Sequence, residues 1–87
     1  MRLIHEAGTI DVPYERVCLE VDYDAGADIG GVIADCWTIR AYDTADNTET
    51  SWVMGVFFDE QKALDAMRLV ASAYGLGSKV FRFGKVG

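Results

Sequence analysis

Residues 59–74 have the spacing of one amphipathic helix, and no other segment constrains the fold as strongly. Asp59 suits the N-cap position, where its carboxylate can accept a hydrogen bond from a backbone N–H group of the first turn. Apolar residues then recur at helical spacing and would form one buried stripe: Ala63, Met67, Val70 and Tyr74, widened by Leu64, Ala66, Ala71 and Ala73. Gly75 suits the left-handed position that follows many helices. We therefore predict one helix from about Asp59 to Tyr74.

The segments that flank this helix have the composition of β-strands. Residues 51–58 are apolar on both faces, which is typical of a central strand of a sheet. The alternative is that one face of this strand contacts another subunit. Residues 79–83 are expected to form the last strand, with Phe81 and Phe83 facing inward.

The first half of the chain alternates between apolar and polar residues, as strands with one wet face do. Residues 2–6 are a short candidate strand, and residues 17–23 alternate clearly. Residues 24–31 contain three glycines and two aspartates, which predicts a loop. A strand is expected after this loop, and its alternating pattern is clear from Cys36 onward. Residues 43–49 are a polar turn that suits a hairpin.

These elements predict a single α+β domain that spans residues 1–87, with the order β-β-β-β-α-β. The fold would be an antiparallel four- to five-stranded sheet with the C-terminal helix packed on one face. The connection through the helix is long enough for the last strand to lie parallel to the strand at residues 51–58. The other face of the sheet has no second helix to cover it, so we expect a second copy of the chain to do so.

The formal net charge of −6 is unevenly distributed along the chain. Residues 20–49 contain eight acids and one base, Arg40, whereas residues 50–87 contain five bases and three acids. The acidic middle segment argues against direct binding of DNA or RNA, which depends on basic side chains that neutralise phosphates. The simplest explanation of these acids is solubility.

Nothing in the sequence predicts a membrane segment or export. The first four residues are followed at once by His5 and Glu6, so no apolar leader forms. No uncharged run of the sequence, residues 50–58 included, is long enough to span a membrane. Two cysteines, Cys18 and Cys36, are too few for a disulfide framework. We therefore expect a cytoplasmic protein with reduced thiols.

No group of residues has the pattern of a catalytic, metal or cofactor site. His5 is the only histidine, and nothing local brings it to Cys18 or Cys36, as a nucleophile–base pair would require. One run of aspartates resembles the start of a calcium loop, but it lacks the glycine and the glutamate that such a loop requires. The glycine-rich stretches lack the lysine of a phosphate-binding loop. We expect no enzymatic activity and no cofactor.

The best candidates for a partner or ligand surface are aromatic and charged residues of the predicted strands and polar turn: Trp37, Arg40, Tyr42, Trp52, Asp43, Asp46 and Glu49. Trp37 and Trp52 should lie on neighbouring strands, where they either pack in the core or form an aromatic patch. Arg40 and Tyr42 alternate with core-facing residues and should share the uncovered face of the sheet. The three acids carry the negative charge that a mimic of nucleic acid would need.

Residues 57–67 and 71–76 resemble a strand–helix unit that is common in small bacterial and phage domains. In those domains an aromatic strand end meets an acidic cap, and an alanine-rich helix closes on glycine, as Phe58, Asp59 and Gly75 do in this chain. Orphan proteins of mobile gene cassettes, such as integron cassettes, and phage accessory proteins are similar in size and style. The resemblance carries no catalytic or binding residues to transfer, and it implies an accessory protein of unknown function.

The leading functional hypothesis is a non-enzymatic accessory or interaction module that acts as a homo-oligomer, with a further protein partner as an option. Its basis is an apolar content of 51% in a chain whose core must be thin, together with the missing catalytic pattern. One alternative is an acidic inhibitor or nucleic-acid mimic that binds a basic protein. The other is a small-molecule-binding protein with a pocket between helix and sheet or at a subunit interface.

Overall fold

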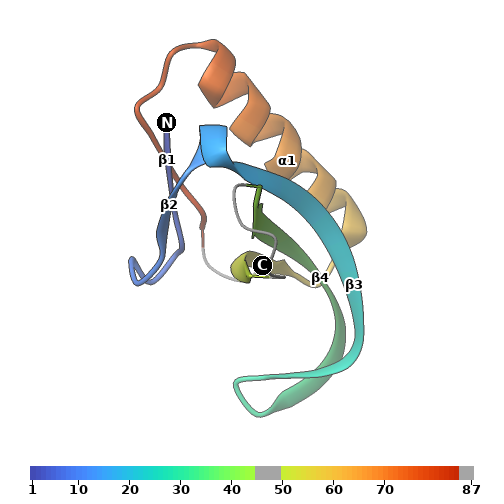
Figure 1. Cartoon of the computed structure of the whole chain (residues 1–87). Helices are drawn as coiled ribbons and strands as arrows, with labels where there is room; N and C mark the ends of the chain where they lie inside the picture. The colour runs from blue at the N-terminus through green and yellow to red at the C-terminus, as the bar shows by residue number, and fades with distance from the viewer. Residues whose placement is uncertain (45–49, 85–87) are drawn as a thin grey trace.

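The computed structural model describes residues 1–44 and 50–84, which form six strands, one α-helix and one 3₁₀ turn (Figure 1). The elements in chain order are β1 Arg2–Ile4, β2 Asp11–Pro13, η1 Tyr14–Arg16, β3 Val17–Ile29, β4 Val32–Asp43, β5 Ser51–Phe57, α1 Glu60–Gly75 and β6 Val80–Arg82. The α+β class is confirmed, as is a single α-helix in the described part of the chain. Most of the predicted polar turn, residues 45–49, lies outside the described residues.

The strands form two three-stranded sheets, whereas the sequence predicts one sheet of four or five strands. The larger sheet has the order β3-β4-β5 and is antiparallel. The smaller sheet has the order β2-β1-β6, with β1 antiparallel to β2 and parallel to β6. The last strand is thus parallel to its neighbour, but that neighbour is β1 instead of β5. Strands of three residues show too little alternation for their pairing to be predicted.

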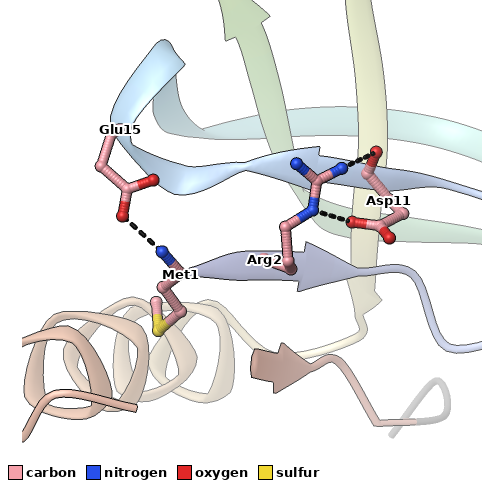
Figure 2. Close-up of polar contacts among 4 residues, drawn as sticks. All are labelled: Met1, Arg2, Asp11 and Glu15. Carbon is pink, nitrogen blue, oxygen red and sulfur yellow. Dashed lines mark hydrogen bonds and ion pairs between the residues drawn. The ribbon is translucent and has the colours of Figure 1, made fainter. Parts of the chain in front are cut away.

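The sequence does not predict β2, a three-residue strand that ends in Pro13. Proline is tolerated here because β2 is an edge strand of the smaller sheet. Two ion pairs hold β1 to this segment (Figure 2): Arg2 Nε lies 2.7 Å from Asp11 Oδ1, and the N-terminal ammonium of Met1 contacts Glu15. The hydrogen bond from that ammonium lowers the pKa of the Glu15 carboxyl.

The strands β3 and β4 form one long hairpin, so the predicted loop at residues 24–31 is wrong. The strand β3 continues to Ile29, and the connection consists of only Gly30 and Gly31. Both glycines have positive φ, at 61° and 88°, as a tight two-residue hairpin turn requires. A third glycine, Gly26 with φ 65°, lies in a bulge where the register shifts. The glycines therefore shape a continuous hairpin.

The helix α1 begins where the sequence predicts and ends later. The Asp59 side chain accepts a hydrogen bond from the Gln61 N–H at 2.8 Å, which confirms the N-cap. At the other end, Gly75 is still helical, and the left-handed residue is Gly77, with φ 78°. The Gly77 N–H donates to the Tyr74 carbonyl at 3.1 Å and closes the helix end.

One hydrophobic core joins both sheets to the helix. The helix packs on the face of the larger sheet that carries Ile39 and Ala41, as the alternation along β4 predicts. The smaller sheet reaches the same core through Leu3 on β1 and through Phe83, which follows β6. The buried side chains of this core are Leu3, Val12, Ile39, Ala41, Met54, Val70 and Phe83.

The strand β5 lies at an edge of the larger sheet, which contradicts the prediction of a central strand. Its ladder with β4 runs from the Tyr42–Ser51 pair to the Trp37–Phe57 pair. On its far side, no backbone hydrogen bond joins β5 to another segment within residues 1–44 and 50–84. Its side chains are buried or half-buried along the whole strand. Within the described residues, β5 has one neighbouring strand, β4, although it is apolar on both faces.

Candidate interaction surfaces

The hairpin of β3 and β4 extends beyond the rest of its sheet. The strand β5 accompanies β4 only as far as the pair between Trp37 and Phe57, so residues 24–36 form a ribbon of two strands. We call these residues the arm. Figure 1 shows the arm curving away from α1 to the turn of the hairpin. A ribbon of two strands is marginally stable in water, so a partner that covered the arm would stabilise it.

The surface of the arm is apolar and acidic. Val32 and Ile33 are 58% and 67% exposed, and Tyr23 at the root of the arm is 55% exposed. The arm has no base and three acids: Asp24, Asp28 and Asp35. Asp28 and Asp35 accept hydrogen bonds from backbone N–H groups of the turn and the bulge, at 2.9 Å and 3.0 Å. Such a surface is unsuited to phosphate groups and suited to a protein.

The face of the larger sheet that points away from α1 carries a polar network. Arg40 Nε lies 3.5 Å from Asp22 Oδ2, and Arg40 Nη2 lies 4.0 Å from Asp24 Oδ2. The Tyr42 hydroxyl donates to Asp22 Oδ2 at 2.9 Å. This hydrogen bond, followed by burial and the charge of Asp22, raises the pKa of Tyr42. Two acids of the acidic segment are thus paired within the fold, which reduces the charge that could imitate nucleic acid.

Two small side chains of β4 on this face are buried, Cys36 at 1% exposure and Thr38 at 4%. Burial, followed by the charges of Asp24 and Asp35, raises the pKa of the Cys36 thiol. The thiol therefore stays protonated at neutral pH and is a poor nucleophile. The Thr38 hydroxyl makes no hydrogen bond to another described residue, and Cys18 on β3 is exposed.

The structure divides the predicted surface residues among different places. Arg40 and Tyr42 lie together in the polar network, as their alternation predicts. Trp37 lies on the opposite face, where its ring centroid is 5.2 Å from that of Tyr23. Trp52 pairs with Ala41, which lies four residues after Trp37 along β4. The two tryptophans are therefore on neighbouring strands without forming one patch.

Trp52 and Asp43 line a small pocket of about 190 Å³. Its other walls come from β2, η1 and the start of β3: Val12, Pro13, Arg16 and Val17. Asp46 and Glu49, the other two acids of the predicted surface, lie outside the described residues. The structure thus brings one acid of the predicted surface beside one of its tryptophans.

A larger pocket of about 310 Å³, which the sequence does not predict, lies between α1 and β6. Its apolar walls are Phe57, Ala66, Leu69, Phe81 and Phe83. The signal that could have found it is Leu69, an apolar helix residue outside the predicted stripe. Leu69 is 61% exposed, so it does not belong to the core that the stripe forms.

The described residues contain no group of three or more histidine, cysteine or acidic side chains that could hold a metal ion. His5 Nδ1 accepts a hydrogen bond from the Ala7 N–H at 3.2 Å. Among the described residues, no hydrogen bond joins His5 to Cys18 or Cys36. Within residues 1–44 and 50–84, no helix has both the length and the apolar character needed to cross a membrane.

No protein family, curated protein sequence or solved structure gives a significant match to the chain. The edge strand β5, the arm and the two pockets are therefore the features that bear on function.

Proposed function

We propose that this chain is a non-enzymatic accessory module that acts through self-association, as a homo-oligomer. The position of β5 carries this proposal. The strand is uncharged and apolar on both faces, as central strands are, yet it lies at the edge of its sheet. A strand from a second copy would supply the neighbour that β5 lacks in the described chain.

The two edges of the larger sheet differ in a way that favours β5 as the contact. Natural sheets protect exposed edges with charged residues, proline or bulges. The other edge strand, β3, carries four acids: Glu20, Asp22, Asp24 and Asp28. Between Ser51 and Phe57, β5 has neither a charged residue nor a proline, and its protection is one bulge beside Met54. The β5 edge is therefore the better suited to pairing with another strand.

Antiparallel pairing of β5 with β5 of a second copy would extend the sheet to six strands around a twofold axis. Two copies that each carry a charge of −6 repel one another, so contact is favoured where charge is absent. Residues 50–58 are an uncharged run that includes the whole of β5. The half-buried Val53 and Val56 lie on this strand and would lose more of their exposed surface in such a dimer.

Light scattering over a wide range of protein concentration tests the proposal. We expect a dimer at high concentration that dissociates on dilution. The variant Val53→Lys should be monomeric throughout, because the dimer would bury an ammonium group without a partner. A native chain that remains monomeric at the highest concentration would contradict self-association as the function.

The matched control is Cys18→Lys, which adds the same charge at an exposed position on β3, the opposite edge of the sheet. This variant should keep the dimer, and circular dichroism should show that both variants are folded. If Cys18→Lys dissociates the dimer as completely as Val53→Lys, then net charge controls association and the assignment to the β5 edge is wrong.

A further inference from the structure

The pocket between α1 and β6 has an aromatic wall. Phe57 stands at the end of β5, and the rings of Phe81 and Phe83 meet edge to face with centroids 5.2 Å apart. Ala66 and Leu69 form the wall on the helix side. Because Leu69 is exposed and Phe81 is only half-buried, an apolar ligand would remove apolar surface from water here. A volume of about 310 Å³ is at the small end of the range for ligand pockets.

The rim of this pocket has two positive groups, Lys62 and Arg82, that form no ion pair within the described residues. The charged residues that line the pocket are Lys62, Asp65 and Arg82. Asp65 is already engaged, because it accepts a hydrogen bond from the Gln61 side chain at 3.0 Å and lies 3.3 Å from Arg68 Nη1. Lys62 forms no ion pair with another residue of the described chain. Its ammonium can therefore pair with a negative group that enters the pocket.

The charge of the surrounding chain also favours a negative ligand at this pocket. Residues 50–87 contain five bases and three acids, in contrast to the acidic segment at residues 20–49. Arg82 adds a positive charge, although its Nη1 lies towards the turn between β1 and β2, 3.8 Å from where a Cβ of Gly8 would be. An anion would thus meet less repulsion here than at the acidic outer face.

We propose that this pocket binds a small hydrophobic carboxylate. Its apolar or aromatic body would lie against Phe57, Phe81 and Phe83, where ring contacts add to the burial of apolar surface. Its carboxylate would pair with Lys62, and charge-assisted hydrogen bonds of this kind are stronger than neutral ones. This binding goes beyond self-association and does not require the dimer.

Titration of the isotope-labelled chain with octanoate, followed by amide NMR shifts, tests the proposal, with octanol as the neutral probe of equal chain length. We expect shifts at Leu69, Phe81 and Phe83 and a roughly tenfold preference for octanoate, the effect of one charge-assisted contact. In Lys62→Met, the preference for octanoate should fall to what Arg82 alone supports, and the affinity for octanol should be unchanged. The control Lys79→Met removes an exposed cation that does not line the pocket, and it should keep the preference.

Several outcomes would overturn the proposal. Equal affinity of the native chain for octanoate and octanol would show that the pocket does not recognise the carboxylate. Amide shifts outside the pocket would show that the probe binds elsewhere. Shifts of the pocket amides that follow protein concentration, without a response to either probe, would assign the pocket to a second copy of the chain.

Discussion

The hairpin of β3 and β4 has a stem and an arm that share the same two strands and differ in what stabilises them. In the stem, residues 17–23 and 37–43, β4 pairs with β5 as well as with β3, and α1 packs on one face. The arm, residues 24–36, has two strands alone. Two isoleucines on the same face of β4 show the difference, because Ile39 is 0% exposed and Ile33 is 67% exposed.

This difference teaches that the length of a strand does not measure its stability. The ladder between β3 and β4 continues through the arm almost without interruption, yet no residue of the arm belongs to the core cluster. In the stem, the same residue types exclude water between a sheet and a helix. The exposed side chains of Val32 and Ile33 in the arm therefore contribute little to folding, and they remain accessible to another molecule.

The largest expected effect comes from shortening the two isoleucines in turn. Ile39→Ala should lower the free energy of unfolding by about 2–5 kcal/mol, because it leaves a cavity in the core. Ile33→Ala removes the same atoms from an exposed site and should change it by less than about 0.5 kcal/mol. Urea unfolding of both variants measures the comparison. Equal losses would show that the arm is covered by another part of the same molecule or by a second copy.

Replacement of two glycines by alanine gives the next largest effect. The two replacements destabilise the protein for different reasons, one by crowding and one by backbone strain. Beside the stem, on β5 opposite Ile39, a Cβ on Gly55 would lie 3.0 Å from the Phe57 ring and 3.2 Å from the Phe83 ring. Gly55→Ala should therefore lower the free energy of unfolding by about 1–3 kcal/mol through overpacking. In the arm, a Cβ on Gly26 would have no atom within 4 Å, but its φ of +65° strains any other residue.

Because this strain falls on a ribbon whose residues lie outside the core cluster, Gly26→Ala should open the arm locally. We expect amide hydrogen exchange to become faster in residues 24–36 and the urea midpoint of the whole chain to stay nearly unchanged. A fall in the midpoint as large as that of Gly55→Ala would show that the arm and the stem unfold as one unit.

Features that depend on a few neighbouring residues could be predicted from the sequence, and features that depend on distant pairing could not. The cap at Asp59 and the shared face of Arg40 and Tyr42 follow from local spacing. The sequence predicts that Gly75 is the left-handed residue after the helix, whereas in the structure this residue is Gly77. Both glycines suit the position, and the local sequence does not distinguish them. The division into two sheets depends on β6 meeting β1, which lies at the other end of the chain.

The candidate surface was predicted in part for the same reason. Alternation shows which face of a strand a residue occupies, but it does not show where the neighbouring strand stops. The ribbon of the arm exists because β5 ends at Phe57 while β4 continues, and no local signal marks that end. The pocket between α1 and β6 forms because Leu69 and Phe81 come together from two different elements. The sequence of either element alone therefore does not predict it.

The smallest effect concerns two tyrosines of the stem, of which Tyr42 bonds within the stem and Tyr23 bonds to the arm. Hydrogen bonding to Asp22 raises the pKa of Tyr42, and hydrogen bonding to Asp35 raises the pKa of Tyr23. A pKa that is higher in the folded state than in the unfolded state means that the protonated hydroxyl stabilises the fold. This stabilisation is fully present below pH of about 10, the ordinary tyrosine value, and is lost as the pH rises above it.

Replacement of each tyrosine by phenylalanine should locate that alkaline loss. Tyr42→Phe should lower the urea midpoint at neutral pH and weaken its further fall above about pH 10, since the hydroxyl that titrates there is gone. Tyr23→Phe should leave the midpoint almost unchanged and accelerate amide exchange in residues 24–36, because its partner Asp35 belongs to the arm. Tyr74→Phe, which alters a ring whose centroid lies 4.7 Å from that of Tyr14 at a tilt of 58°, is the control for loss of a hydroxyl. If Tyr23→Phe changes the alkaline midpoint as much as Tyr42→Phe does, the arm contributes to global stability and the distinction between arm and stem fails.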